Sequence, residues 1–321
     1  LAYTIREAFH IARSGRPGPV LIDVPKDVQN AKTEFVYPED EIILPGYQLP
    51  DPASTEQVNA ALELIRTAER PVILAGHGVL MAGAMKELQQ FVERAEIPVA
   101  LTLLGRGGIP ASHPLVMGMM GMHGEAACNH AIQEADLLIA LGMRFDDRVT
   151  GNLKTYSPNS KKIHVDIDAS ELNKNIKVDV GICSDLKTVL NQLLALLPTK
   201  KHTPWLERID GWQAESQERD VLNHDSNGQL ISAQVLHDLW KYTEGNALIV
   251  TDVGQHQMIE AQYYPHENPH TAITSGGAGT MGFGLPSSIG VKFGRPDDTV
   301  WVIVGDGSFQ MTLCELGTAV Q

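Results

Sequence analysis

The stretch TVWVIVGDGSF, residues 299–309, decides the fold class of this sequence. The apolar, mostly β-branched residues 300–304 predict a buried strand, which ends at Gly305-Asp306-Gly307 before an amphipathic run begins. Open α/β sheets bind ligands at the carboxyl ends of such parallel strands. The glycines let an anion approach the backbone, Ser308 is a candidate helix cap, and Asp306 is a candidate magnesium ligand. The alternative is a tight strand-to-helix turn that binds nothing.

The composition favours a soluble chain that binds small ligands. With 321 residues, of which 43% are apolar, the chain is long enough for about two domains. A net charge of −14 and a pI near 5.2 argue against nucleic acid or an anionic membrane as partner. Cys128, Cys183 and Cys314 form no C-x-x-C pair, which is typical of reduced thiols in the cytoplasm. No transmembrane run and no signal peptide is recognisable, so we expect a cytoplasmic location.

Strand and helix patterns alternate along most of the chain, which predicts doubly wound parallel sheets covered on both faces. Residues 1–30 are expected to form a helix, a turn and a strand (20–24), and residues 31–53 a proline-dotted linker. An α/β domain is expected at 54–198 and the start of another at 229–321. Between them, residues 199–228 are expected to form a polar surface connector with a weak helix. Because the chain starts and stops inside helical patterns, we expect it to be a piece of a longer protein.

The middle domain, 54–198, contains the clearest alternation. Its expected strands are 72–75, 99–102, 137–141, 163–167 and 178–182, and its helices include 81–95, 125–134 and 186–197. Ser54 and Gln57 have the spacing of a capping box, so a helix is expected to begin between them.

Glycines follow two of these strands. Gly76-His77-Gly78 comes after one, Gly142 and Arg144 come after another, and a third strand ends at Asp166 and Asp168. Glycines and a guanidinium at strand ends suit the pyrophosphate of a dinucleotide, and the carboxylates can accept ribose hydroxyls. Since no complete G-x-G-x-x-G is present, local structure is the favoured explanation for each residue taken alone, whereas three strand ends suited to the same ligand favour a shared site.

Three segments near the end of the chain indicate one pocket. They are TDVGQHQM (251–258), TSGGAGTMG (274–282) and GDG, and strand ends of a parallel sheet meet at one edge. Glycine-rich loops with one carboxylate indicate a diphosphate bound through a metal, and the lack of G-x-x-x-x-G-K-[ST] argues against a nucleoside triphosphatase. Met281 is either a core residue or a support for the ligand. His123, Cys128 and His130 match no zinc spacing.

Together these segments resemble the thiamine-diphosphate enzymes, and within them the large catalytic subunits of acetohydroxyacid synthase, also called acetolactate synthase. The matching stretches are SGRPGPVLIDVPKDVQ (14–29), GMHGEAACNHAIQEADLLIALGMRFDDRVTGN (121–152), HVDID (164–168), TDVGQHQM (251–258), TSGGAGTMGFGLPSSIG (274–290) and GDGSF (305–309). They are spread over nearly the whole chain, and RFDDRVTGN and GQHQM are more specific than GDG.

The resemblance implies a central FAD-binding, Rossmann-like (DHS-like) domain between a partial pyrimidine-binding domain and a partial diphosphate-binding domain. It assigns FAD to Arg16, Gly76, Gly78, Thr102, His123, Gly124, Gly142, Arg144, Asp166, Asp168 and Asp185. It assigns thiamine diphosphate to Val253, Gly254, Gln255, His256, Gly279, Met281, Gly305, Gly307 and Ser308, with Met281 as the support that bends the cofactor. Asp306 would bind magnesium, while Arg148, Met122 and Asp147 would border the substrate channel, with Arg148 facing a keto-acid carboxylate.

The implied reaction is decarboxylation of pyruvate and transfer of its two-carbon unit to a second 2-keto acid, pyruvate or 2-ketobutyrate. This is the first common step of branched-chain amino-acid synthesis, and FAD is not consumed in it. The resemblance also implies a homodimer and a small regulatory subunit.

The family's activating glutamate and an Asn-Asn magnesium motif are not found in this sequence. We therefore expect no catalytic residue in the chain and no activity of the chain alone. The alternatives are another thiamine-diphosphate enzyme, such as pyruvate oxidase or glyoxylate carboligase, and a non-catalytic flavin-binding module.

Overall fold

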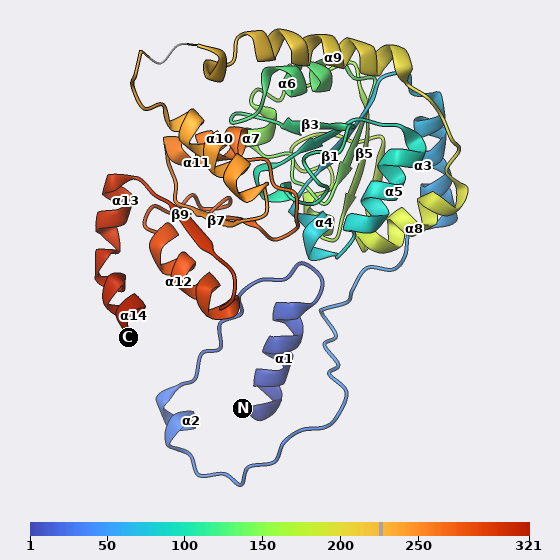
Figure 1. The fold of residues 1–321 in the computed structure, drawn as a ribbon. Helices are drawn as coiled ribbons and strands as arrows, with labels where there is room; N and C mark the ends of the chain where they lie inside the picture. The colour runs from blue at the N-terminus through green and yellow to red at the C-terminus, as the bar shows by residue number, and fades with distance from the viewer. Residues whose placement is uncertain (225–226) are drawn as a thin grey trace.

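A six-stranded parallel sheet forms the centre of the molecule (Figure 1). The computed structural model describes residues 1–224 and 227–321. The strands are β1 (Pro71–Ala75), β2 (Val99–Leu101), β3 (Val116–Met119), β4 (Leu137–Leu141), β5 (Lys161–Asp166) and β6 (Val180–Cys183), in the order β3-β2-β1-β4-β5-β6. This is the order of dinucleotide-binding sheets, which places the switch point between β1 and β4. The predicted α/β fold with parallel sheets is confirmed.

Two layers of helices cover this sheet, and alternate residues of each strand face different layers. Ile73 and Ala75 of β1 are buried with α3 (Thr55–Thr67), α4 (His77–Met81), α5 (Met85–Ala95) and α8 (Leu186–Leu196). Val72 and Leu74 are buried on the other side with α6 (Ala126–Glu134) and α9 (Thr203–Glu218). Because helices bury both faces of the sheet, β1 and β4 consist of apolar residues only.

The helices of the middle unit begin close to their predicted positions. Ser54 Oγ accepts a hydrogen bond from the Gln57 backbone N–H at 3.2 Å, and Gln57 Oε1 accepts one from the Ser54 N–H at 2.9 Å, so the predicted capping box is confirmed. The helix expected at 81–95 is confirmed for residues 85–95, but its predicted start is wrong. Gly83 has a φ of +59°, a left-handed conformation that ends one helix, α4, before the next, α5, begins.

The helix α9 lies in the segment that was expected to be a surface connector. It is 16 residues long, and Trp205 and Ile209 are 3% and 2% exposed. Trp205 Nε1 donates a hydrogen bond of 3.1 Å to the Pro71 carbonyl oxygen at the start of β1. The expectation of a weak surface helix is wrong, because the apolar side of α9 completes the layer that α6 begins.

A second parallel sheet contains β8 (Ala272–Thr274), β7 (Leu248–Thr251) and β9 (Val300–Ile303) in that order. Figure 1 shows α10 (Ser232–Thr243) and α11 (Gln255–Tyr263) above these strands and α12 (Gly284–Gly294) below them. The predicted burial of β9 is wrong, since Trp301 and Val302 are 38% and 37% exposed. Within the described residues β9 is an edge strand that pairs only with β7.

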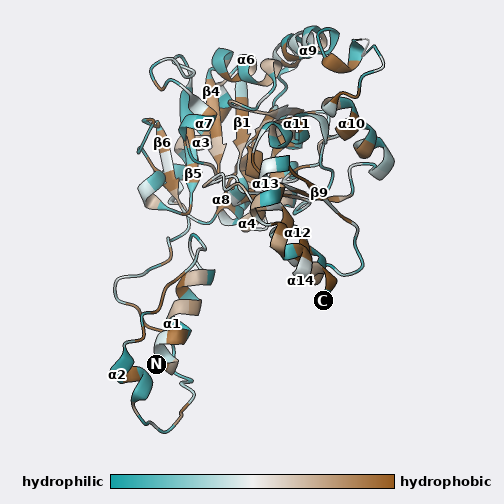
Figure 2. Cartoon of the chain, turned by 90° about the vertical axis from the view of Figure 1, so that its left-hand side faces the viewer, coloured by the Kyte–Doolittle hydropathy of each residue, from teal (hydrophilic) through white to brown (hydrophobic). Residues whose placement is uncertain are grey.

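Residues 1–53 lie outside both sheets, below the main body in Figures 1 and 2. Helix α1 (Ala2–Arg13) is confirmed, but the strand expected at 20–24 is wrong, and Leu21 is 89% exposed. A strand needs a hydrogen-bonded neighbour, and no described segment pairs with residues 20–24. After α2 (Lys26–Asn30), residues 31–54 are described throughout and contain neither helix nor strand.

The remaining elements are short. They are α7 (Asp147–Thr150), α13 (Asp306–Met311), α14 (Leu316–Val320) and the 3-10 helices η1 (Leu103–Gly105), η2 (Ala169–Glu171), η3 (Val221–Asn223) and η4 (Leu313–Glu315). Among the described residues, no helix has the length and apolar character needed to span a membrane.

Candidate functional site

A cavity of about 560 Å³ lies at the carboxyl ends of β7 and β9 and is closed on one side by α10. Its walls include many of the residues that the sequence assigned to a diphosphate site: Val253, Gln255, His256, Met281, Gly305, Asp306, Gly307 and Ser308. Gly254 lies against the His256 ring, and Gly279 lies beside Val253. The structure therefore brings the three predicted segments together at one sheet edge.

His256 stands between two glycines of this cavity. A Cβ atom at Gly254 would be 2.9 Å from its ring carbon Cε1, and one at Gly305 would be 3.2 Å from the same atom. Its Nε2 is buried and has no hydrogen-bond partner among the described residues. Burial lowers the pKa of His256, against an opposing effect of Asp252, so the ring is neutral at neutral pH. Among the described residues, Nε2 thus remains a buried hydrogen-bonding atom without a partner.

Asp252, which the sequence analysis did not select, holds the cavity together. It is fully buried, and its carboxylate accepts hydrogen bonds from the backbone N–H groups of Val253 (2.8 Å), Gly282 (3.1 Å) and Gly284 (2.6 Å). Burial raises the pKa of Asp252, but these bonds and one from the Ser308 hydroxyl outweigh it and lower the pKa. An ionised carboxylate therefore ties all three segments to the end of β7.

The GDG turn differs in one detail from its prediction. Gly305 is the N-cap residue of α13, without a side-chain cap, and Ser308 is buried with its hydroxyl on Asp252. The role of Ser308 as a helix cap is therefore wrong, because α13 begins at Asp306 and Ser308 lies inside it. Asp306 is exposed at the cavity wall. Across residues 1–224 and 227–321, no three His, Cys, Asp or Glu side chains are grouped closely enough to hold a metal ion.

A second group of predicted residues lies at the carboxyl ends of β1 and β4, the switch point of the large sheet. Gly76 follows β1 and Gly142 follows β4. A Cβ atom at Gly78 would be 2.5 Å from the Gly142 Cα atom, and the Gly78 N–H donates a bond of 2.9 Å to the Gly142 carbonyl. These glycines are therefore required by contact between two turns of the chain itself.

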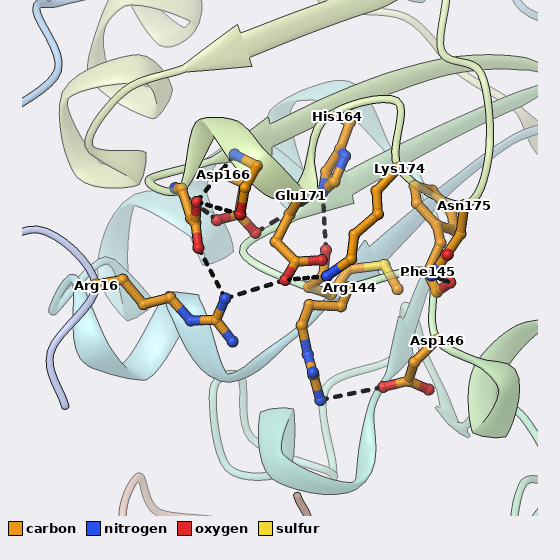
Figure 3. A network of polar contacts seen from close by, with 12 residues as sticks. Arg16, Arg144, Phe145, Asp146, His164, Asp166, Glu171, Lys174 and Asn175 are labelled. Carbon is orange, nitrogen blue, oxygen red and sulfur yellow. Dashed lines mark hydrogen bonds and ion pairs between the residues drawn. The ribbon is translucent and has the colours of Figure 1, made fainter. Parts of the chain in front are cut away.

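Arg16 reaches this edge from the N-terminal segment. Figure 3 shows its guanidinium pointing toward the carboxylates that follow β5. Arg16 Nη1 is 2.8 Å from Asp168 Oδ2 and 3.0 Å from Glu171 Oε1, and Lys174 Nζ is 3.1 Å from the same Glu171 oxygen. Bonds from Ser170 and Arg16 lower the pKa of Asp168 to about 2. Glu171 lies in the segment 166–185 that the resemblance assigns to FAD, but it was not selected singly, since an isolated Glu after a strand carries no pattern.

His164 and Asp166 lie deeper at the same edge. His164 Nε2 donates a hydrogen bond of 2.8 Å to the Met143 carbonyl, while its Nδ1 is buried without a partner among the described residues. Burial lowers the pKa of His164 and raises that of Asp166. Asp166 accepts a bond from the Asp168 N–H at 2.9 Å, which orders the turn after β5.

Two of the residues assigned to FAD have structural partners already. Thr102 Oγ1 accepts a hydrogen bond from the Gly105 N–H at 3.0 Å and thereby caps η1. Asp185 is the N-cap residue of α8 and accepts a bond from the Thr188 N–H at 2.8 Å. Each side chain has a local reason to be present.

The residues assigned to a substrate channel come together near α7. Arg148 Nη1 is 3.7 Å from the Met122 sulfur, and the Met122 side chain is 56% exposed. Asp147 is the first residue of α7. Arg144 forms an ion pair of 3.4 Å with Asp146, the residue that caps α7.

His123 contacts the second unit, whereas Gly124 packs against the end of β3 in the large unit. The His123 carbonyl accepts a hydrogen bond of 3.0 Å from Gln262 of α11. Burial and the nearby Arg148 and Arg106 lower the pKa of His123. A Cβ atom at Gly124 would be 2.5 Å from the Met119 carbonyl oxygen, so this turn is closely packed.

Two models of known protein families match the two regions described above. The family model described as the thiamine pyrophosphate enzyme central domain matches residues 58–193, and the thiamine pyrophosphate enzyme C-terminal TPP-binding domain matches residues 252–321. The chain belongs to the thiamine pyrophosphate enzymes. All the predicted residues that line the cavity fall in the segment matched by the TPP-binding domain of these enzymes.

Relatives of this thiamine pyrophosphate enzyme chain carry a more specific name. The chain is 41% identical to the acetolactate synthase isozyme 3 large subunit of Escherichia coli (strain K12), over 99% of its own length and 56% of the relative. It is 45% identical to the acetolactate synthase large subunit of Corynebacterium glutamicum, over 98% and 51%, and 44% identical to the probable acetolactate synthase large subunit of Methanocaldococcus jannaschii, over 98% and 55%. The resemblance inferred from the motifs is confirmed. The chain spans about half the length of these curated relatives.

Proposed function

We propose that the chain acts in an acetolactate synthase. The reaction is the thiamine-diphosphate-dependent decarboxylation of pyruvate and transfer of the two-carbon unit to pyruvate or 2-ketobutyrate, the first common step toward valine, leucine and isoleucine. The observation that carries this proposal is the 40–45% identity to acetolactate synthase large subunits along nearly the whole chain. The cavity at the ends of β7 and β9 supports it, because its donors fit a diphosphate cofactor.

The residues of the cavity have complementary roles in this proposal. When bound, thiamine diphosphate supplies the carbon nucleophile and the electron sink for decarboxylation. Gly305 and Gly307 leave the backbone open to diphosphate oxygens, and the Asp306 carboxylate binds the accompanying Mg²⁺. His256 Nε2, which has no partner among the described residues, hydrogen bonds to the cofactor. Met281, 48% exposed at the wall, supports its apolar part.

We further infer that FAD binds at the carboxyl edge of the large sheet. The strand order and the switch point between β1 and β4 support this site. Arg16 and Arg144 would pair with the pyrophosphate, while Asp166 and Asp168 would accept ribose hydroxyls. Two buried polar atoms, His164 Nδ1 and Ser184 Oγ, lack partners among the described residues. His164 is two residues before Asp166, and Ser184 directly precedes Asp185, so both fit a site for a polar ligand.

The proposed domain limits follow the same family. Residues 54–198 would be the FAD-binding domain, 1–30 the end of the pyrimidine-binding domain, and 229–321 part of the diphosphate-binding domain, with 31–53 and 199–228 as connections. Arg148, beside Met122, would face the carboxylate of the keto acid. A cytoplasmic homodimer with a small regulatory subunit is the assembly that this family assignment favours.

The reaction is tested on the protein as its gene encodes it. With thiamine diphosphate, Mg²⁺, FAD and pyruvate, we expect acetolactate, and acetohydroxybutyrate once 2-ketobutyrate is added. Product formation that requires an external electron acceptor would identify a pyruvate oxidase and contradict the proposal.

The cofactor site is tested separately on the 321-residue chain. Thiamine diphosphate with Mg²⁺ is titrated into it while tryptophan fluorescence is recorded. Asp306→Ala should weaken Mg²⁺-dependent binding, and Asp297→Ala, at an exposed aspartate outside the cavity lining, is the matched control. Equal binding by both variants would remove Asp306 from the site.

A further inference from the structure

A buried cluster of three ionisable side chains joins the two sheets. Arg106 follows η1 in the large unit, whereas Glu260 belongs to α11 and His266 follows it. Arg106 Nη2 is 2.8 Å from Glu260 Oε2, and His266 Nε2 is 2.8 Å from Glu260 Oε1. The three residues are 6%, 0% and 2% exposed. Such a cluster costs desolvation free energy, so it persists only where its charges balance.

The charges of this cluster do balance. Burial opposes ionisation of Glu260, but Arg106 and His266 outweigh it and lower the pKa of the carboxyl. Burial also lowers the pKa of His266, so its ring is neutral at neutral pH. His266 Nε2 lies 2.8 Å from Glu260 Oε1, Nδ1 lies 2.8 Å from Thr271 Oγ1, and the Thr271 hydroxyl donates to the Asn268 carbonyl at 2.8 Å. One guanidinium therefore faces one carboxylate.

Further hydrogen bonds near the cluster join the loop after β2 to the segment that follows α11. The Ala111 N–H donates a bond of 3.1 Å to the His266 carbonyl, and Ser112 Oγ donates one of 2.6 Å to Glu267 Oε2. A Cβ atom at Gly107 would be 2.5 Å from the Asn268 carbonyl oxygen. The loop after β2 is thus packed tightly against the segment that follows α11.

Glu260 lies one helical turn after His256 on the same helix. Residues four apart on an α-helix share a face, so a displacement of Glu260 moves His256 with it. Gln255 and His256 line the cavity at the start of α11, while Arg106 holds Glu260 further along the helix. The position of the cavity wall consequently depends on the ion pair.

We propose that Glu260 is a positioning residue, whose ion pair with Arg106 fixes α11 against the large sheet and thereby holds Gln255 and His256 in place for thiamine diphosphate. The ligand named here rests on the function proposed above. The geometric part of the claim, that the pair fixes α11, does not depend on it.

The test compares three variants of the 321-residue chain. Glu260→Gln keeps the shape but leaves the Arg106 charge without its partner. The double variant R106M/E260M removes both charges and fills similar volume, and such a replacement often restores stability. Glu267→Gln is the matched control, because it changes a carboxylate of the same junction that binds a neutral serine.

The first measurement is the Kd of thiamine diphosphate with Mg²⁺, together with the urea midpoint of unfolding. We expect binding weakened on the order of tenfold in E260Q. In the double variant the urea midpoint should recover while the Kd stays raised. A Kd that returns to the wild-type value with the midpoint, or an unchanged Kd in E260Q, would overturn the positioning role.

The second measurement is hydrogen exchange at the backbone amides of α11, which requires no cofactor. E260Q and the double variant should both exchange faster at residues 255–258 than the wild-type chain and E267Q. If the wild-type chain fails to bind thiamine diphosphate, the proposed function fails. The exchange experiment alone then tests whether the ion pair fixes α11. Unchanged exchange in the double variant would then refute the proposal.

Discussion

The Asp252 carboxylate and the backbone N–H of Gly284 are 2.6 Å apart, which ties the end of β7 to the first residue of α12. A Cβ atom at Gly284 would be 3.1 Å from both Asp252 Cβ and Oδ2, so the two residues approach closely. The contact is made by a buried, ionised side chain that directly precedes Val253, a residue of the cavity wall.

We therefore expect Asp252→Ala to destabilise the chain by about 3 kcal/mol, because it leaves two buried and one half-buried backbone N–H groups without an acceptor. Urea unfolding at neutral pH measures the change, with exposed Asp297→Ala as control. The folded-state pKa of Asp252 lies below its unfolded value, so its stabilisation is present above that unfolded pKa and is lost as the pH falls through the folded one. A loss of stability no larger than that of the control would contradict this account.

Gly305→Ala should affect ligand binding more than folding. The added Cβ would lie 3.2 Å from His256 Cε1 and 3.3 Å from Nδ1, which pushes the ring toward the cavity. We expect binding of thiamine diphosphate to weaken about tenfold, while unfolding changes by less than about 1 kcal/mol. Gly290→Ala on α12 meets no atom within 4 Å and serves as control. Equal affinities of both variants would show that the ring tolerates the methyl group.

Glu125 predicts a pH dependence of stability. Burial and the nearby Asp220 raise its pKa to about 7, well above an unfolded value of about 4.3. Between these two values the folded state binds more protons, so stability falls as the pH rises toward the folded pKa and levels off above it.

Urea midpoints between about pH 5 and about pH 8 check this dependence. Glu125→Gln should lose that decline, whereas Glu215→Gln, at an exposed glutamate, should keep the wild-type profile. Parallel profiles for the wild type and E125Q would exclude Glu125 as its source.

Arg16→Met separates a role in binding from one in folding. Its guanidinium side chain is 48% exposed, so loss of its ion pairs with Asp168 and Glu171 should cost less than about 1 kcal/mol. If Arg16 pairs with the FAD pyrophosphate, flavin fluorescence titration should record affinity reduced by about tenfold or more. Arg66→Met removes a comparable exposed pair with Glu63 and should leave FAD affinity intact. Undiminished FAD binding by R16M would argue against the pairing.

Much of the fold was predictable because it depends on local patterns. The apolar runs of β1 and β4 and the capping box at Ser54 carry their structure in neighbouring residues. The strand β3 was missed, since Val116–Met119 contains two methionines and a glycine and has no β-branched run. Residues 20–24 have a strand composition but no neighbour to pair with among the described residues.

The cavity was predictable in part for a topological reason. Glycine-rich ends of parallel strands meet at one edge, so Gln255, Met281 and Asp306 could be grouped from sequence. Asp252 was overlooked, although an aspartate directly after a buried strand was a usable signal. Arg106 and Glu260 are 154 positions apart, and only the packing of α11 on the loop after β2 brings them together.

The two-sided burial of β1 determines where the chain tolerates a change of length. Inserting one residue inside this strand would turn Ile73 and Ala75 toward the α6 layer and Val72 and Leu74 toward the α3 layer. Every side chain beyond the insertion would then occupy a space shaped for another. At Gly83, where an added Cβ meets no atom within 4 Å, an extra residue extends into solvent. Homologous chains should accordingly differ in length at such turns while keeping the six strands at constant length.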